Sequence, residues 1–208
     1  MSTEQKVAVV TGASQGIGAG LLQAFRDRNY RVVATSRSIK PVSDSNIATV
    51  QGDVAAPDTA ERVFRTAVER FGRVDTLVNN AGMFMAKPFT AYSQDDYAVY
   101  LSTNVTGFFH MTQRALELMS KQGRGHIVTI TTSLVDQPMS SVPAALASLT
   151  KGVLSAATKA LAIEYARTGI RVNAVSPGII KTPMHPAEAH QALAALHPVG
   201  RMGDCPTS

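Results

Sequence analysis

The chain has 208 residues, 45% of them hydrophobic and 17% charged, which is the size and composition of one globular domain with a substantial core. Its net charge of +5 comes from scattered Lys and Arg residues, so no basic run indicates a nucleic-acid partner. The apolar runs are too short to span a membrane, the start is polar, and the single cysteine, Cys205, excludes an internal disulfide. We therefore predict one cytoplasmic domain over residues 1–208, with no membrane partner.

The first expected strand, residues 6–11, runs directly into a segment with three glycines and then into a helical pattern. Gly12 can take a tight turn, Gly16 lets the backbone approach a pyrophosphate, and Gly18 lets the helix pack closely on the strand. The free N–H groups of the helix would face the anion. Strand, glycine turn and helix in this order predict a dinucleotide-binding loop. Its predicted cofactor contacts are Gly12, Ser14, Gln15, Gly16, Ile17 and Gly18.

Apolar runs of strand length alternate along the chain with segments of helical periodicity. This alternation predicts an α/β fold, in which helices cover both faces of a doubly wound parallel β-sheet. The expected strands are residues 6–11, 31–36, 46–51, 74–79, 126–131 and 170–175. Ser93 and Asp96 have the spacing of a helix start, and the helix that they begin is expected to run past Asn104.

The end of the second strand bears on the choice of cofactor. In a dinucleotide fold an acid at this point binds the ribose 2′-hydroxyl of NAD, whereas Arg binds the 2′-phosphate of NADP. Here the strand ends in Ser36-Arg37, with no acid, and both side chains can donate hydrogen bonds to a phosphate. The sequence therefore favours NADP(H) over NAD(H). The alternative is that Arg37 is a solvated loop residue.

Further motifs follow the later strands in a fixed order. They are Gly52-Asp53-Val54, Asn79-Asn80-Ala81-Gly82, Asn104, Thr131-Thr132-Ser133, Lys151, Asn173-Ala174-Val175-Ser176-Pro177-Gly178 and Thr182. Together with the glycine loop, this set resembles the short-chain dehydrogenase/reductase family over residues 6 to about 200. The resemblance implies a Rossmann fold and hydride transfer between a nicotinamide cofactor and a small-molecule carbonyl or alcohol.

The resemblance also implies further cofactor contacts. Asp53 and Val54 would lie at the adenine, although an Asp in such a position also stabilises turns. Lys151 would bind the nicotinamide ribose. The other implied contacts are Asn80, Ala81 and Gly82 along the cleft and Pro177, Gly178 and Thr182 at the nicotinamide.

For catalysis, the resemblance implies that Ser133 polarises the substrate oxygen, that Lys151 supports proton transfer and that Asn104 holds a water. Thr132 is the other candidate for the Ser133 role. The family places a Tyr four residues before this Lys, so that the two side chains share one face of a helix. That position is Ala147 here, and none of the five tyrosines has a Lys four residues later.

The absent phenol leaves three functions open. In the first, the chain is an NADP-dependent reductase or dehydrogenase in which a water takes the place of the phenol. In the second, it is a catalytically impaired NADP(H)-binding protein such as a regulatory subunit. The third alternative is an unstable, truncated relative. We predict no metal site, because the histidines at 185, 190 and 197 lack metal-ligand spacing and a Cys partner.

The C-terminal part also departs from the family. After a segment like 198–203, family members continue into another helix and a last parallel strand, neither of which follows here. We therefore expect strand 170–175 to form an exposed sheet edge. Residues at about 179–200 would form a short substrate lid. The segment 144–168, rich in small and apolar residues, would form a homodimer contact.

Overall fold

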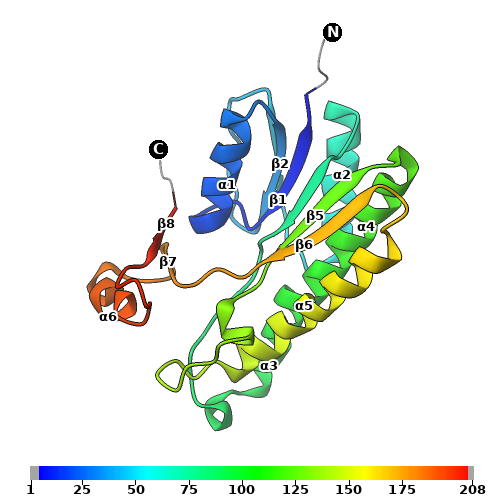
Figure 1. Ribbon diagram of the computed structural model, residues 1–208. Coiled ribbons are helices and arrows are strands. Elements are labelled where there is room, and N and C mark those ends of the chain that lie inside the picture. The colour runs from blue at the N-terminus through cyan, green and yellow to red at the C-terminus, as the bar shows by residue number, and fades with distance from the viewer. Residues whose placement is uncertain (1–4, 206–208) are drawn as a thin grey trace.

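The computed structural model describes residues 5–205, which form one six-stranded parallel sheet in the order β3-β2-β1-β4-β5-β6 (Figure 1). The strands are β1 (Val7–Thr11), β2 (Arg31–Ser36), β3 (Ile47–Gln51), β4 (Thr76–Asn79), β5 (Gly125–Ile130) and β6 (Ile170–Val175). The strand order changes direction between β1 and β4, so their carboxyl ends form the crevice in which such sheets bind ligands. All six expected strands and the doubly wound fold class are confirmed.

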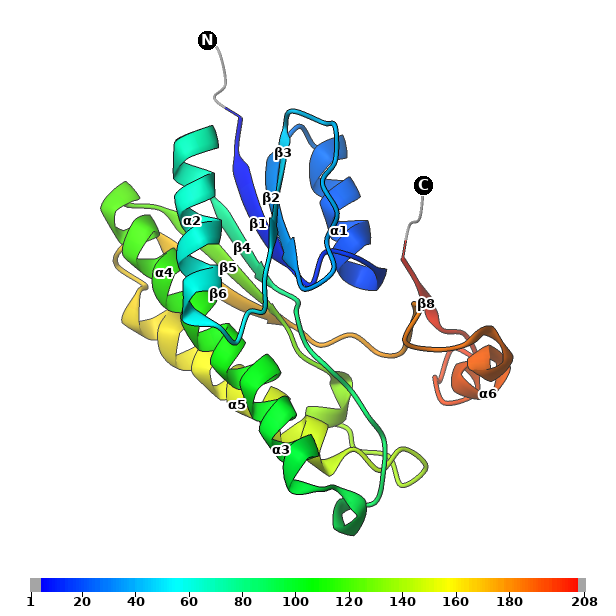
Figure 2. The same cartoon turned by 180° about the vertical axis from the view of Figure 1, so that it is seen from behind.

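Helices cover the sheet on both faces (Figures 1 and 2). They are α1 (Gly16–Asp27), α2 (Pro57–Phe71), α3 (Gln94–Tyr100), α4 (Gly107–Gln122), α5 (Ala145–Glu164) and the short α6 (His190–Ala194). One face carries α1, and the other carries α2, α4 and α5. Ser93 caps α3 by accepting the N–H of Asp96, whose carboxylate accepts the N–H of Ser93 in return, as the sequence predicts. A π-helical segment, Leu101–Thr106, joins α3 to α4.

Two apolar cores lie on opposite faces of the sheet, because buried parallel strands present apolar side chains on both sides. The larger core packs β1, β2, β4 and β5 against α2 and α4, with Val9, Phe64 and Met111 among its buried members. The smaller core lies under α1, where Val10 and Val32 are fully buried. Each such side chain contributes about 1.5–3 kcal/mol through burial, so the central strands hold the crevice firmly.

β6 forms an edge of the sheet, as the sequence predicts, because within residues 5–205 it pairs with β5 alone. Side chains along β6 point alternately to the two faces of the sheet. Arg171, Asn173 and Val175 point to the face on which α1 lies, and all three are exposed. Val175 is 50% exposed. On this side of the sheet α1 stands over the other half, next to β1 and β2 (Figure 1). The β5–β6 half of that face is therefore open.

The segment after β6 forms a small unit beyond the carboxyl end of the sheet (Figures 1 and 2). Two short strands, β7 (Ile180–Lys181) and β8 (Gly203–Asp204), pair in parallel around α6. Lys181 Nζ and Asp204 Oδ1 form an ion pair at 2.8 Å, and Met202 is buried. The sequence does not predict this pair, because strands of two residues carry no periodic signal.

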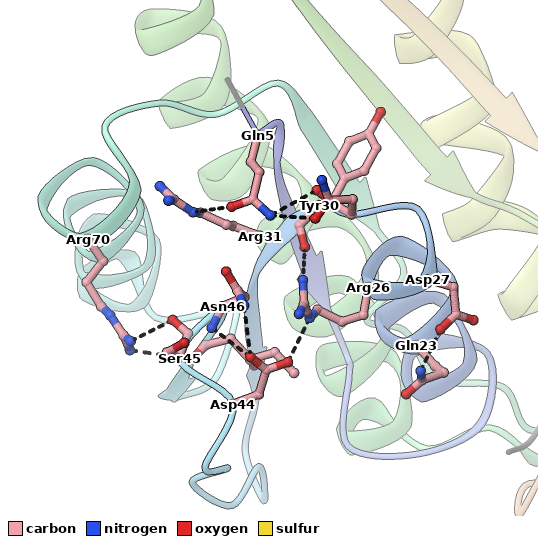
Figure 3. Close-up of polar contacts among 12 residues, drawn as sticks. Gln5, Gln23, Arg26, Asp27, Tyr30, Arg31, Asp44, Ser45, Asn46 and Arg70 are labelled. Carbon is pink, nitrogen blue, oxygen red and sulfur yellow. Dashed lines mark hydrogen bonds and ion pairs between the residues drawn. The ribbon is translucent and has the colours of Figure 1, made fainter. Parts of the chain in front are cut away.

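The connection from β2 to β3 carries Arg37 near its start and is fastened at its far end (Figure 3). Arg26 Nε on α1 donates to Asp44 Oδ2 at 2.8 Å, and Asp44 Oδ1 accepts the N–H of Asn46 at 2.8 Å. The Asn46 N–H, followed by Arg26, lowers the pKa of Asp44. Arg70 on α2 donates to the Ser45 carbonyl at 3.2 Å. Helices from both faces thus hold this connection.

One helix within residues 5–205, α5, is long and apolar enough to span a membrane by length and composition alone. It packs along β6 and buries polar side chains, including Thr150, Lys151 and Thr158. Core helices of soluble proteins meet the same test, so this property is weak support for a membrane segment.

Candidate functional site

The glycine loop at the end of β1 has the geometry of an anion cradle. Gly12 and Gly16 have φ values of +65° and +55°, which favour glycine. A Cβ on Gly18 would lie 2.2 Å from the Gly12 carbonyl oxygen, so α1 can approach β1 only with glycine there. Gln15 precedes α1 without capping it by its side chain. The first-turn N–H groups of α1 therefore remain available to a phosphate.

Thr11 and Asn80 fasten the glycine loop to the end of β4. Thr11 Oγ1 accepts the N–H groups of Asn80 and Ala81, at 3.0 and 2.9 Å, and donates to the Val78 carbonyl. Asn80 Nδ2 donates to the carbonyls of Thr11, at 2.9 Å, and Gly12, at 3.3 Å. Asn80, predicted as a cofactor contact, thus uses its side chain to shape the cradle.

Donor groups gather at the end of β2. The exposed Arg37 guanidinium makes no hydrogen bond or ion pair within residues 5–205. The buried Ser36 Oγ accepts the N–H of Ser38 at 3.2 Å, and Ser38 Oγ lies 3.4 Å from Ser14 Oγ in the glycine loop. The hydroxyls of Ser14 and Ser38 thus lie together, and Ser38 directly follows Arg37 in the sequence. The sequence reasoning missed Ser38, although a hydroxyl directly after Arg37 is a readable signal.

Asp53 and Val54 lie just beyond the carboxyl end of β3. Asp53 Oδ1 accepts the N–H of Ala55 at 2.9 Å, which is the turn-stabilising role that the sequence left open. Val54 is buried against Gly107 at the start of α4, where a Cβ would lie 2.5 Å from Val54 Cγ2. The adenine contact of both residues stays a prediction.

Lys151 on α5 reaches the carboxyl end of β5 and the segment after β4. Its Nζ donates to the Ile130 carbonyl at 2.7 Å, and the residue is 8% exposed. Burial lowers the pKa of Lys151 from 10.5 to about 8. A Cβ on Gly82 would lie 2.9 Å from Lys151 Nζ and 3.2 Å from Asn104 Oδ1. Gly82 therefore makes room for both side chains.

Asn104 lies in the π-helical segment, a distortion often found at functional sites. Asn104 Oδ1 accepts the N–H of Met83 at 2.9 Å, and its Nδ2 donates to Thr150 Oγ1 at 3.1 Å. The side chain thus joins the segment after β4 to α5, next to Lys151. Its implied role of holding a water stays a prediction.

The two candidate hydroxyls after β5 differ in their environment. Thr132 Oγ1 accepts the N–H of Leu134 at 3.3 Å and so caps a short turn of helix. The Ser133 hydroxyl makes no hydrogen bond to any residue that the structure describes, while its N–H donates to the Pro177 carbonyl at 3.1 Å. Ser133 is therefore better placed to donate to a substrate oxygen.

Ala147 is 1% exposed and packs in an apolar cluster with Leu134, Leu146 and the ring of Tyr100. The Tyr100 hydroxyl is bonded to both the N–H and the carbonyl of Met85, and burial raises the pKa of Tyr100 to about 12. This phenol is therefore held in its hydrogen bonds and does not replace the group missing at Ala147.

The segment after β6 approaches the glycine loop from the other side. A Cβ on Gly16 would lie 3.2 Å from Thr182 Cβ, so these two predicted cofactor contacts adjoin. His197 Nε2 accepts the N–H of Ile179 at 2.9 Å, with its ring against Gly178, where a Cβ would lie 2.7 Å from Nε2. The sequence does not predict these contacts of His197, because nothing in its spacing links it to Gly178.

Among residues 5–205, no three His, Cys, Asp or Glu side chains gather in a way that could hold a metal ion. The polar groups collected at the carboxyl end of the sheet are instead an anion cradle, free donors and a buried ammonium. Together they fit a dinucleotide cofactor, because the α1 N–H groups suit its pyrophosphate and the exposed Arg37 suits a further phosphate.

Known proteins are similar to this chain in sequence and in fold. A family model described as short chain dehydrogenase matches residues 6–192. Oxidoreductase UcpA of Escherichia coli (strain K12) is 35% identical over 198 residues, covering 90% of this chain and 74% of UcpA. The 3-oxoacyl-(acyl-carrier-protein) reductase FabG of Vibrio cholerae is 34% identical over 213 residues, covering 98% of this chain and 86% of FabG.

Solved structures with the same fold have bound cofactors. The structure of ElxO with NADP bound has a TM-score of 0.89 and 29% identity, and the match covers 97% of this chain and 87% of ElxO. A 3-ketoacyl-(acyl-carrier-protein) reductase from Brucella melitensis, complexed with NADH, has a TM-score of 0.88 and 26% identity, with coverage of 98% and 87%.

Proposed function

Because the chain belongs to the short-chain dehydrogenase/reductase family, we propose that it is an NADP(H)-dependent oxidoreductase that acts on a carbonyl or alcohol of a small molecule. One observation carries the proposal: the glycine cradle and the buried Lys151 ammonium lie at the same carboxyl end of the sheet. Family relationship supports a nicotinamide cofactor, and the solved relatives include both an NADP and an NADH complex.

The preference for NADP(H) rests on Arg37. Its guanidinium is exposed and unpaired within residues 5–205, no acid stands at the end of β2, and Ser38 and Ser14 add hydroxyl donors. An acid here would repel a 2′-phosphate, whereas Arg can bind it through two parallel hydrogen bonds. The other contacts proposed for the cofactor are Gly12, Ser14, Gln15, Gly16, Ile17, Gly18, Ser36, Asp53, Val54, Asn80, Ala81, Gly82, Lys151, Pro177, Gly178 and Thr182.

When bound, the cofactor supplies or accepts the hydride. The protein's part is to orient the substrate and to handle a proton. The Ser133 hydroxyl donates a hydrogen bond to the substrate oxygen and so polarises the carbonyl. Lys151 would place a positive charge beside the ribose of a bound cofactor, and Asn104 accepts the Met83 N–H and so holds the segment after β4 in place.

Cofactor titration tests this proposal directly. We expect NADPH to bind the wild type more tightly than NADH, followed by cofactor fluorescence. Arg37→Ala should weaken NADPH binding about 10- to 100-fold, the loss expected for one charge-assisted pair, and leave NADH binding nearly unchanged. Arg28→Ala, which removes another exposed arginine, is the matched control. Equal affinity of the wild type for the two cofactors would contradict the NADP preference.

A second candidate function is a cofactor-binding protein without turnover, and the burial of Ala147 in an apolar cluster favours it. NADPH oxidation with a panel of carbonyl compounds separates the two functions when wild type and Ala147→Tyr are compared. Turnover by the wild type supports the reductase. Turnover by Ala147→Tyr alone supports the binding protein.

We also propose a cytoplasmic homodimer. Exposed apolar side chains follow the outer faces of α4 and α5, with Phe109 53%, Leu149 46%, Val153 47% and Ile163 80% exposed. Such a patch on a monomer commonly marks a protein interface.

A further inference from the structure

We propose that Lys151 is the proton donor for carbonyl reduction in this chain, a part for which position 147 offers no acidic group. The inference rests on the proposed reductase function and deepens it. It follows from three observations: the nearby hydroxyls are committed to other bonds, the Lys151 ammonium has protons to spare, and the absence of a side chain at Gly82 leaves space beside it.

Nearby hydroxyl donors are already engaged. Tyr92 and Tyr100 both donate to the Met85 carbonyl, at 2.6 and 3.1 Å. On α5, Ser148 Oγ donates to the Leu134 carbonyl at 3.1 Å, and the buried Thr150 Oγ1 lies 3.1 Å from the Leu146 carbonyl. Each of these four hydroxyls thus already donates its proton to a backbone carbonyl and would have to break that hydrogen bond to reach a substrate.

Ser133 is the hydroxyl that remains available beside the cleft. It can polarise a substrate oxygen by donating a hydrogen bond. An alkyl hydroxyl does not, however, release its proton to solution near neutral pH and so does not serve as the acid itself.

The Lys151 ammonium has the required proton and access. An ammonium carries three protons, and the Ile130 carbonyl is its one hydrogen-bond acceptor within residues 5–205, at 2.7 Å. Gly82 is exposed, and a Cβ there would lie 2.9 Å from Nζ. The absence of a side chain at Gly82 therefore leaves space beside Nζ, next to the surface.

The pKa of Lys151 suits a proton donor. Desolvation lowers the pKa of Lys151 to about 8, close to the range in which a general acid works best. On the elements packed around Lys151 the titratable or charged groups are Asp95, Asp96, Tyr97 and Tyr100 on α3, His126 on β5, Arg171 on β6 and Asp136 after the Ser133 turn. None of them forms an ion pair with Lys151 or contributes to its pKa shift. The ammonium is thus a buried acid without a carboxylate to stabilise it.

Atoms and electrons balance in the proposed step. A bound reduced nicotinamide would supply the hydride to the carbonyl carbon, so that the C=O bond becomes a C–O single bond. The carbonyl oxygen takes one proton from the Lys151 ammonium as the N–H bond breaks. The products are the alcohol, the oxidised cofactor and a neutral Lys151 amine, which regains its proton from water.

A first test measures the acidity of Lys151 without any turnover. Chains labelled with ¹³C at the lysine Cε carbon give one resonance per lysine. The resonance that Lys151→Arg removes should titrate near pH 8. Lys159→Arg, which replaces an exposed lysine of the same helix, should leave that resonance in place and so confirms its assignment. A Lys151 resonance that titrates near 10.5 would overturn the proposal.

A second test uses Lys151→Arg, which keeps the positive charge but cannot give up a proton at these pH values. We expect this variant to lose about 10²- to 10⁴-fold in kcat for carbonyl reduction, measured at saturating NADPH so that a change in cofactor affinity does not enter. The wild-type kcat should fall above pH 8, and Lys151→Arg with Ala147→Tyr should recover part of the lost rate.

The outcomes separate this inference from the proposed function. A wild type that binds no NADPH overturns both. A wild type that reduces carbonyls with a kcat that is flat across pH 8, or a Lys151→Arg variant that keeps its kcat, overturns the proton-donor assignment alone. NADPH binding without product also overturns that assignment and supports the binding protein.

Discussion

Burial of the Lys151 ammonium sets stability against function at one residue. The pKa of Lys151 is about 8 in the folded chain and 10.5 for a lysine in water, so folding disfavours the protonated form. The resulting loss of stability is fully present below pH 8 and disappears as the pH rises toward 10.5. The buried ammonium therefore does not help to stabilise the fold below pH 8.

We expect Lys151→Met to raise the free energy of unfolding at pH 7 by at most about 3 kcal/mol, the equivalent of the pKa shift, less the lost bond to Ile130. Thermal unfolding of both proteins measures the difference, which should shrink as the pH approaches 10.5. Lys159→Met, on the exposed side of α5, should change little at either pH. A Lys151→Met protein less stable than wild type at pH 7 would refute the argument.

Close packing at Gly18 makes a second residue-scale prediction. Gly18→Ala places a Cβ 2.2 Å from the Gly12 carbonyl oxygen, so backbone must shift, and we expect a loss of roughly 2–3 kcal/mol in stability. Gly152→Ala on α5 is the control, since its Cβ would meet only Val135 Cγ1, at 3.8 Å. In urea unfolding the control should be unchanged or up to about 1 kcal/mol more stable, because Ala favours a helix interior. Equal effects would contradict the packing argument.

At the scale of elements, His197 links two parts of the segment after β6. Its Nε2 accepts the Ile179 N–H, while the Ile179 carbonyl accepts the N–H of Gly203 at 3.0 Å. The backbone between Gly178 and Thr182 is therefore held on both sides, in front of the glycine loop.

We expect His197→Ala to loosen this backbone, weaken NADPH binding several-fold and speed proteolysis between residues 178 and 182. His190→Ala is the control, because its ring bonds the His185 carbonyl within the same segment and touches no predicted cofactor contact. The two measurements are a cofactor titration and limited proteolysis followed by mass spectrometry. Identical behaviour of the two variants would argue against a specific role for His197.

The elements predicted best from the sequence are those with strong periodicity. Strands β1 and β2 carry unbroken apolar runs, residues 7–10 and 32–34, because both of their faces are buried, and Ser93 and Asp96 mark the start of α3 directly. β7 and β8 escaped prediction because a two-residue strand is fixed by its partner and not by its own pattern.

Individual site residues were predictable where a backbone demand selects the residue type. Gly12 and Gly16 are examples, since their positive φ values require glycine. Ser38 could have been predicted as a hydroxyl directly after Arg37, although its contact with Ser14 could not. His197 was not predictable, because its hydrogen bond to the Ile179 N–H joins segments far apart in the sequence. Asn80 stays a predicted cofactor contact, and its hydrogen bonds to the glycine loop depend on the register of β1 and β4.

At the scale of the whole molecule, the proposed dimer gives a further prediction. Val153→Glu adds a charge in the middle of the α5 patch, and we expect it to shift the chain from dimer to monomer in light scattering. Val68→Glu is matched to it, because Val68 is 43% exposed but lies on α2. A wild type that is monomeric at all concentrations would refute the dimer, and equal dissociation by both variants would refute its placement on α5.

The π-helical segment Leu101–Thr106 fixes the rotational phase between α3 and α4. Each residue of an α-helix turns the chain by about 100°, so deleting one residue there would restore regular winding and rotate α3 by about that angle. Tyr100 would leave the cluster around Ala147, and Ser93 with Asp96 would face a new direction. Substitutions along this helix can be absorbed locally, whereas a change in its length would misalign one wall of the site against the other.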